Sequence, residues 1–206
     1  MGRSVILLVD NSPLGPYRYS AKRFRKLLRQ LSGEEVRAVS FGQLAYRKVL
    51  QEASEARALV LGGFGGWIPR RYYRLVYRAE LRMIRRLRKP MLGVCGGHQL
   101  LAVAFHGEVE GLGRRVRGFK TVQVVERDPI FEGVPDSMVV RQHHHDQVSR
   151  LPEGFKLLAT SSTTKVEAMK HVSEPLYGLQ FHPERFDKAH LHGRAILSNF
   201  LRIAST

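Results

Sequence analysis

In the first half of the chain, short apolar runs alternate with longer stretches whose apolar residues recur at helical spacing. The runs with the length and composition of buried strands are Val5–Val9, Val36–Phe41, Ala58–Leu61 and Met91–Val94. The stretches with a helical period are Tyr17–Leu31, Tyr72–Leu87 and Gln99–Phe105. Strands that alternate with helices in this way predict βαβ units and a parallel sheet.

Beyond Glu108 the pattern changes to short strands separated by turn residues, followed by a closing helix. The strands predicted there are Val122–Val125, Met138–Arg141, Lys156–Ala159, Val166–Lys170 and Leu176–Gln180, and the closing helix is Ala189–Ile203. No repeat, low-complexity segment or linker divides the sequence. We therefore predict an α/β fold in a single domain, residues 1–206. It should have a mostly parallel central sheet flanked by helices, with an additional antiparallel strand region in the second half.

The composition is that of a folded protein: 206 residues, of which 43% are hydrophobic and 25% charged. No apolar run approaches the ~20 residues of a membrane span, and Ser4–Asp10 lacks the features of a signal peptide. We therefore expect a cytoplasmic protein that contacts no membrane. The chain has one cysteine, which rules out an internal disulfide and leaves a thiol free for chemistry.

Basic residues outnumber acidic ones, with 34 Lys and Arg against 18 Asp and Glu, and the formal net charge is +16. The basic residues are concentrated in two segments, Arg18–Arg29 and Arg70–Lys89. A surplus of this size is typical of proteins that bind a polyanion such as nucleic acid, the ribosome or an acidic protein face. Charge runs are also typical of solvated helix faces, and the sequence leaves both interpretations open.

The single cysteine lies in Gly93-Val94-Cys95-Gly96-Gly97-His98-Gln99, which follows a predicted strand and opens a predicted helix. A nucleophile at a sharp strand-to-helix turn has this setting, with glycines where a Cβ would collide. Aligned N–H groups at a helix N-terminus favour a thiolate, and the N–H of Gly96 is placed to donate to a developing oxyanion. The alternative is that Cys95 is a small buried hydrophobic residue.

A second motif, Gln180-Phe181-His182-Pro183-Glu184, ends another apolar run. A thiol nucleophile needs a base, and an imidazole base needs a third group that fixes its tautomer. Pro183 favours an extended backbone at His182, in which residues two apart share a face. His182 and Glu184 are therefore predicted to point the same way, as a base and the group that orients it.

Gly-x-Cys-x-Gly-His-Gln with a downstream Gln-Phe-His-Pro-Glu resembles the class I (Cys-His-Glu) glutamine amidotransferases, which have a flavodoxin-like architecture. The resemblance covers nearly the whole chain and includes Leu61-Gly62-Gly63 and His144-x-Asp146-x-Val148. Glu167-Ala168-Met169-Lys170-His171 followed by Pro175-Leu176-Tyr177-Gly178 is most like the glutaminase subunit of archaeal-type GMP synthetase.

The resemblance implies hydrolysis of L-glutamine to glutamate and ammonia through a γ-glutamyl thioester, without a cofactor. It implies Cys95 as nucleophile, His182 as general acid and base, and Glu184 as the residue that orients His182. It also implies an oxyanion and glutamine-binding pocket formed by Gly62, Gly63, Gly96, Gln99, His143 and His144. The ammonia would pass to a separate ATP-dependent XMP aminase, because the sequence has no Ser-Gly-Gly-x-Asp-Ser loop of an ATP pyrophosphatase.

Three features depart from the family. Phe64 stands where the family has a glycine in its Ser-Gly-Gly-Pro loop, and a bulky residue there would resist a positive φ. Gln142 stands where the GMP synthetase relatives tend to carry Glu, and Tyr72–Leu87 has more arginine than that subunit is expected to have. Two rival hypotheses stay open: an amidotransferase fold recruited to RNA or the ribosome, which the charge supports, and a related γ-glutamyl peptide hydrolase, against which Gln99 counts.

Two further motifs bear on ligand binding. His143-His144-His145 suggests a metal site, but consecutive residues of an extended chain alternate between faces. No other His, Asp or Glu spacing completes such a site, so no metal site is predicted. The run Gly62-Gly63-Phe64-Gly65-Gly66 lacks the Lys-Ser/Thr of a Walker phosphate loop and is better explained by close backbone approach to an amino-acid substrate.

Overall fold

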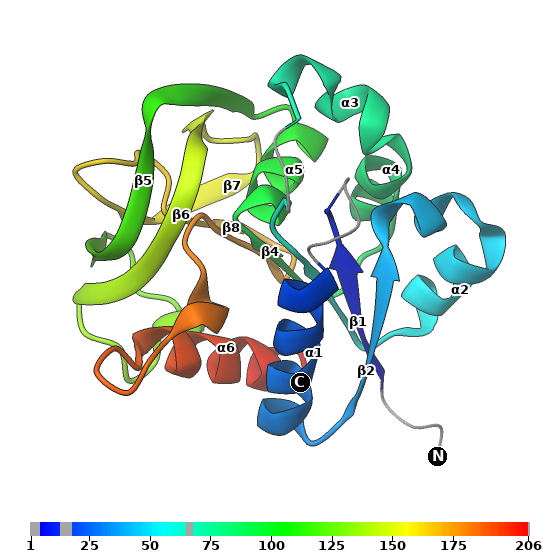
Figure 1. Ribbon diagram of the computed structural model, residues 1–206, viewed down its shortest axis with the longest axis horizontal. Coiled ribbons are helices and arrows are strands. Elements are labelled where there is room, and N and C mark those ends of the chain that lie inside the picture. The colour runs from blue at the N-terminus through cyan, green and yellow to red at the C-terminus, as the bar shows by residue number, and fades with distance from the viewer. Residues whose placement is uncertain (1–4, 13–17, 65–67, 206) are drawn as a thin grey trace.

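A sheet of nine strands runs through the computed structural model, which describes residues 5–12, 18–64 and 68–205 (Figure 1). In chain order the strands are β1 (Val5–Asp10), β2 (Glu35–Ser40), β3 (Ala58–Leu61), β4 (Met91–Val94), β5 (Glu108–Val124), β6 (Ser137–Arg150), β7 (Phe155–Thr160), β8 (Ala168–His171) and β9 (Leu176–Leu179). Across the sheet they are ordered β2-β1-β3-β4-β9-β8-β7-β5-β6. The first five in this order pair in parallel, and the remaining pairings are antiparallel.

Helices cover both faces of the parallel half. They are α1 (Arg18–Ser32), α2 (Arg47–Glu55), α3 (Tyr73–Val76), α4 (Arg78–Arg86), α5 (Gly96–Ala104) and α6 (His192–Ile203), with short 3-10 turns at Phe41–Ala45, Arg70–Tyr72, Pro129–Phe131 and Pro183–Arg185. Side chains alternate along β1, so Ile6 and Leu8 share a core with α1 and α6, whereas Leu7 and Val9 share one with α2, α4 and α5. Each such buried aliphatic side chain contributes ~1.5–3 kcal/mol, which fixes the helices on their two faces. Within the described residues, no helix combines the length and the apolar character needed to span a bilayer.

The parallel half follows the hydrophobic pattern closely. All four strands predicted there are present, and each observed end differs from the predicted one by one residue at most. Tyr17 lies outside the described residues, and the helix predicted from it is observed from Arg18 to Ser32. Helix α2 was not predicted, because it buries only Val49 and Ala53 and therefore has almost no apolar stripe.

The prediction of short strands after Glu108 was wrong for two of them. β5 extends over 17 residues and β6 over 14, and they pair along most of their length as an antiparallel ribbon. Most side chains of β5 are exposed or half-buried, so the apolar alternation that would reveal the strand is absent. The predicted Val122–Val125 is therefore only the end of β5, and Val125 lies beyond it and is exposed.

The predicted single helix Tyr72–Leu87 was also wrong, because it is broken at Tyr77 into α3 and α4 (Figure 1). Tyr77 leaves helical geometry (φ −98°, ψ 21°) and is completely buried. Its hydroxyl donates to the backbone oxygen of Asn11 at 2.9 Å, and its ring stacks on Phe64 with centroids 5.1 Å apart. The break thus turns one aromatic side chain inward, toward the end of β3.

Candidate active site

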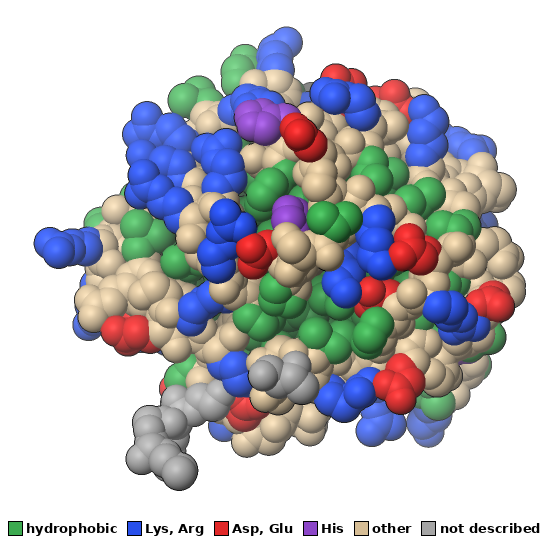
Figure 2. Space-filling view, turned by 180° about the vertical axis from the view of Figure 1, so that it is seen from behind, with side chains coloured by type: hydrophobic (Ala, Val, Ile, Leu, Met, Phe, Trp, Pro, Cys, Tyr) green, Lys and Arg blue, Asp and Glu red, His purple; other side chains and the backbone are tan. Residues whose placement is uncertain are grey.

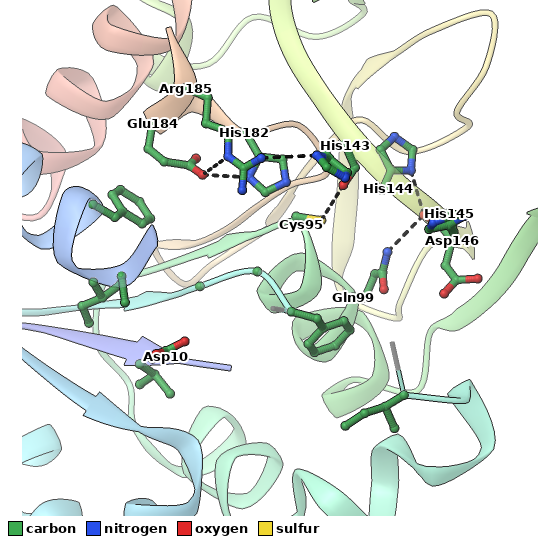
Figure 3. A pocket seen from close by; sticks show the side chains of 18 of the residues that line it. Asp10, Cys95, Gln99, His143, His144, His145, Asp146, His182, Glu184 and Arg185 are labelled. Carbon is green, nitrogen blue, oxygen red and sulfur yellow. Dashed lines mark hydrogen bonds and ion pairs between the residues drawn. The ribbon is translucent and has the colours of Figure 1, made fainter. Parts of the chain in front are cut away.

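The carboxyl ends of the central parallel strands meet at one edge of the sheet, where ligands bind in open α/β folds. Cys95 follows β4, Gln180 follows β9, and Gly62 follows β3. A cavity of about 330 Å³ opens at this edge, and its walls include Cys95, His182 and Gln99. Figure 3 shows Cys95 at the centre, with the His182–Glu184 pair on one side and Gln99 with Asp146 on the other.

Cys95 occupies a strained turn between β4 and α5. Its backbone has φ 51° and ψ −101°, which L-residues rarely adopt and which costs roughly 1–3 kcal/mol. The turn is fixed by the Cys95 N–H, which donates to Leu179 O at 2.8 Å, and by the Gln99 N–H, which donates to Cys95 O at 3.1 Å. The thiol is 8% exposed and points into the cavity at the first turn of α5. This is the nucleophile-elbow geometry expected from the sequence.

Two glycines allow neighbouring backbone to approach this turn. A Cβ on Gly63 would lie 3.4 Å from both Cys95 Cβ and His182 Cε1, and one on Gly96 would lie 2.7 Å from Phe64 N. The loop after β3 and the start of α5 are therefore packed directly against each other. No described residue accepts a hydrogen bond from the N–H of Gly63 or of Gly96, so both donors remain available beside Cys95.

His182 and Glu184 do point the same way. The Nδ1 atom of His182 lies 2.7 Å from Glu184 Oε1, so Nδ1–H donates to the carboxylate and Nε2 is left for the cavity side. Burial of the imidazole favours its neutral form, but the neighbouring Glu184 and Cys95 outweigh it and raise the pKa of His182 to about 10. Burial also works to raise the pKa of Glu184, and the charge of His182 holds it below its ordinary value instead. The pair is thus an ion pair at neutral pH.

Arg185 was not predicted as a site residue, yet it contacts both Glu184 and His143. Its Nε lies 3.4 Å from Glu184 Oε1, and its Nη1 donates to His143 Nδ1 at 3.4 Å. Burial and then the charge of Arg185 lower the pKa of His143 to about 4, which keeps that ring neutral. The sequence signal was present, since Arg185 directly follows the Pro183-Glu184 of the motif.

Phe64 does not strain the loop as expected. Among the described residues, the non-glycine residues with positive φ are Cys95 and His106, so the backbone of Phe64 is not in the region where a bulky side chain is disfavoured. The ring packs between Tyr73 and Tyr77, with centroids 5.0 and 5.1 Å away. Gly65 and Gly66, the other glycines predicted to line this loop, lie outside the described residues.

Gln99 is buried in the cavity wall, and its polar atoms are engaged by the protein. Its Nε2 donates to Asp146 O at 3.1 Å and to Gln180 Oε1 at 3.2 Å, and its Oε1 accepts from the Tyr73 hydroxyl at 3.3 Å. The Nε2 atom of Gln180 in turn lies 3.8 Å from Cys95 Sγ. Gln99 therefore ties α5 to β6 and to the end of β9 behind the thiol, and Tyr73, which was not predicted as a site residue, contributes to the same wall.

The three consecutive histidines alternate as their extended backbone requires. His144 is buried, His143 is half-buried and His145 is exposed, where its Nε2 accepts from Arg115 at 2.8 Å. The described residues contain no group of three or more His, Cys, Asp or Glu side chains arranged to hold a metal ion. His144 donates from Nδ1 to Asp146 O at 2.9 Å, and its buried Nε2 has no partner among the described residues.

Gln142 precedes the three histidines on β6, and it is buried outside the lining of the cavity. Its Nε2 donates to both carboxylate oxygens of the buried Glu167 at 2.9 Å. A glutamate at this position would bring two carboxylates together, and the amide of Gln142 supplies a donor to Glu167 instead. Glutamine at this position is therefore compatible with the buried Glu167.

Comparison with known proteins gives the class: the sequence model of the class-I glutamine amidotransferase family matches residues 26–204, and the chain belongs to that family. A glutamine-hydrolysing GMP synthase subunit of Archaeoglobus fulgidus is 41% identical over 156 residues, which cover 75% of this chain and 79% of the relative. The corresponding subunit of Pyrococcus furiosus is 47% identical over 116 residues, which cover 55% of this chain and 60% of the relative.

A crystal structure of a Thermoplasma acidophilum protein, described as a provisional GMP synthase subunit, agrees in fold. It is 29% identical, with a TM-score of 0.82, and the match covers 100% of this chain and 96% of that one. The relatives support the resemblance seen in the sequence. They give no support to the hypothesis of an RNA-binding or ribosomal protein.

Proposed function

We propose that this chain hydrolyses L-glutamine to glutamate and ammonia. The observation that carries the proposal is the placement of one free cysteine in a strained elbow, beside a buried imidazole that a carboxylate orients at 2.7 Å. Membership of the class-I glutamine amidotransferases supports it. Cys95, His182 and Glu184 are the proposed nucleophile, acid–base group and orienting group.

In the first half of the reaction, the Cys95 thiolate attacks the side-chain carboxamide carbon of glutamine. The N–H groups of Gly63 and Gly96, which no described residue uses, stabilise the oxyanion that forms. The protonated His182 then gives its proton to the leaving nitrogen, and ammonia departs as the γ-glutamyl thioester forms. Because the pKa of His182 is raised to about 10, Nε2 of His182 holds this proton before the attack.

In the second half, water attacks the thioester. His182, now neutral, takes a proton from the water, and glutamate leaves as Cys95 returns to the thiolate. Glu184 keeps Nδ1 of His182 protonated throughout, so that Nε2 is the atom that exchanges the proton. No step needs a metal or an organic cofactor.

The far end of glutamine is assigned to the wall formed by Gln99, His144 and Asp146. Gln99 shapes this wall, because its polar atoms already hold three elements together. The unpartnered Nε2 of His144 is an acceptor next to the cavity, and the α-ammonium group of glutamine is the donor that would satisfy it. Gly62 acts behind the pocket, where its N–H donates to Val9 O and its carbonyl accepts from Asn11.

The ammonia is proposed to serve GMP synthesis from XMP on a separate ATP-dependent protein. This rests on the relatives, which are named as one subunit of glutamine-hydrolysing GMP synthase. It also rests on the match of residues 26–204 to the class-I glutamine amidotransferase family. The same relatives favour this role over that of a γ-glutamyl peptide hydrolase.

The proposal is tested by measuring ammonia release from glutamine with and without the XMP aminase of the same organism. Wild type should release ammonia in at least one of the two conditions, and Cys95→Ala should lower the rate at least ~10³-fold. Glu132→Gln serves as the control for handling and stability, because Glu132 is exposed and does not line the cavity. If wild type releases no more ammonia than Cys95→Ala in both conditions, glutamine hydrolysis is not its function.

A further inference from the structure

The outer side of α3 exposes an unusual group of apolar side chains. Tyr72, Leu75 and Val76 are 41%, 71% and 37% exposed, so three large apolar side chains within five residues face water. Scattered exposed leucines need no explanation, but a contiguous apolar group surrounded by charge is typical of a protein–protein interface.

Arginines surround this group on the same outer side. Arg71 lies over the ring of Tyr72, with its guanidinium carbon 4.9 Å from the ring centroid. Arg74, Arg78 and Arg82 are exposed, and within the described part of the chain none of them forms an ion pair. Figure 2 shows Lys and Arg side chains crowded at the upper left, where α3 and α4 lie in that view. We call the set Arg71, Tyr72, Arg74, Leu75, Val76 and Arg78 the α3 patch.

A hollow of about 410 Å³ adjoins the α3 patch. It lies between α3 and β5, and Arg70, Arg74 and Val109 contribute to its walls. A side chain from a docked protein can therefore enter beside Arg71 and Arg74 of the patch, where the opposite wall also carries Glu108 and Glu110. Such a combination of apolar centre, arginine and recess is where binding energy concentrates in protein interfaces.

The other basic surface lacks the apolar component. Helix α1 exposes Arg25 and Lys26 among other basic residues, yet none of its described side chains is an exposed large hydrophobic residue. A polyanion such as RNA would neutralise arginines on either helix and leave Leu75 in water. An acidic protein surface with an apolar recess would satisfy both features of the α3 patch at once.

We propose that the α3 patch is the docking surface for the ammonia-consuming synthetase subunit, which presents carboxylates around an apolar recess. The inference rests on the proposed function, because that function supplies the partner.

The inner side of the same segment reaches the nucleophile. Tyr73 and Tyr77 alternate in sequence with residues of the α3 patch, are buried, and hold the ring of Phe64 between them. Phe64 belongs to the loop that packs against Gly96, one residue after Cys95. A partner seated on α3 is therefore separated from the oxyanion loop by a single layer of aromatic side chains.

Two variants test the docking surface, each with a matched control. Leu75→Ser removes the most exposed apolar side chain of the α3 patch, and Val172→Ser is its control, since Val172 is 64% exposed in the turn between β8 and β9. Arg74→Glu/Arg78→Glu reverses two charges of the patch, and Arg25→Glu/Lys26→Glu makes the same change in net charge on α1. Binding to the purified XMP aminase is measured by calorimetry at two salt concentrations, together with ammonia release by each chain alone.

We expect Leu75→Ser and Arg74→Glu/Arg78→Glu each to weaken binding at least ~10-fold, the second more strongly at low salt, while both controls bind as wild type does. Equal binding by all variants overturns the docking surface, as does an absence of binding by wild type. A single-stranded RNA that binds wild type and responds to the charge reversal but not to Leu75→Ser overturns it in favour of a polyanion. Ammonia release separates the two hypotheses, because a chain that hydrolyses glutamine but docks elsewhere refutes only the inference.

Discussion

At the scale of single residues, the site depends on how its charges are shared. His182 is buried and the Glu184 side chain is 13% exposed, and each keeps its charged form because the other is present. Removing the carboxylate leaves an imidazolium in a buried place with only Cys95 as a counter-charge. The acid–base behaviour of His182 therefore depends on Glu184 as much as on its own surroundings.

Replacing Glu184 by Gln should lower the pKa of His182 and reduce the rate of glutamine hydrolysis by roughly 10²-fold or more. The raised pKa of His182 stabilises the fold fully below about pH 6.5, its ordinary value, and the contribution is lost as the pH rises through about 10. Wild type should therefore lose stability relative to Glu184→Gln over this window. Titration of the His182 ring by NMR, with urea unfolding at several pH values, measures both effects.

Glu132→Gln is the control for this experiment, because Glu132 forms an exposed ion pair with Arg202. An unchanged His182 titration in Glu184→Gln would show that the carboxylate does not set the protonation of the imidazole.

At the scale of elements, α4 supports the site from behind through a buried polar contact. Glu80 is completely buried on α4, and its Oε1 accepts from Asn11 Nδ2 at 3.1 Å. The same Nδ2 donates to Gly62 O at 3.0 Å, which links α4 to the loop after β3. Glu80 Oε2 and Asn11 Oδ1 are buried acceptor oxygens without a partner among the described residues. A neutral, protonated Glu80 fits these surroundings better than a buried negative charge does. Burial raises the pKa of Glu80 to about 8, despite the hydrogen bond from Asn11.

We expect Glu80→Gln to be tolerated, because the amide keeps the acceptor for Asn11 and never has to be buried as a charge. In wild type, the native state holds a proton on Glu80 that the unfolded chain releases above about pH 4.5. Stability of wild type should then fall relative to Glu80→Gln as the pH rises from about 4.5 through about 8, on the order of a few kcal/mol in total. Urea unfolding of both proteins across this range measures the difference, and parallel pH profiles would contradict a protonated Glu80.

The elements also show which parts of the structure a sequence can predict. β1, β3 and β4 are buried on both faces, so their continuous apolar runs identify them directly. β5 forms half of an exposed ribbon, and its polarity hides it. The break at Tyr77 was not predictable from periodicity, because it arises from contacts with Asn11 and Phe64, which are distant in sequence.

At the scale of the whole molecule, the candidate site could be assembled in advance because its parts follow strands. Cys95, His182 and Glu184 lie in motifs that end β4 and β9, and these strands are neighbours in the sheet. Arg185 was missed although it directly follows Pro183-Glu184 of the motif, and Tyr73 was missed as a site residue because its role depends on tertiary contacts. Phe64 was misjudged for the same reason, since the sequence gives no sign of the two tyrosines that hold its ring.

The net charge of +16 is the other property of the whole molecule that the fold explains in part. Most arginines of 70–88 lie on the outer side of α3 and α4, while the inner side holds Tyr73, Tyr77 and Glu80 in the core. Residues 70–88 thus carry exposed arginines on one side and, on the other, the tyrosines that pack against Phe64 in the loop after β3. Part of the surplus of positive charge therefore lies on that outer surface, and Arg115 and Arg185 line the cavity beside Cys95.

The central claim is that Cys95 forms a γ-glutamyl thioester. The most direct measurement is mass spectrometry of the protein quenched in acid during turnover of isotopically labelled glutamine, followed by peptide mapping. The account predicts a labelled γ-glutamyl group on the peptide that contains Cys95, released by hydroxylamine and absent from Cys95→Ala. Ammonia release by wild type with no label on that peptide, or equal release by Cys95→Ala, would contradict it.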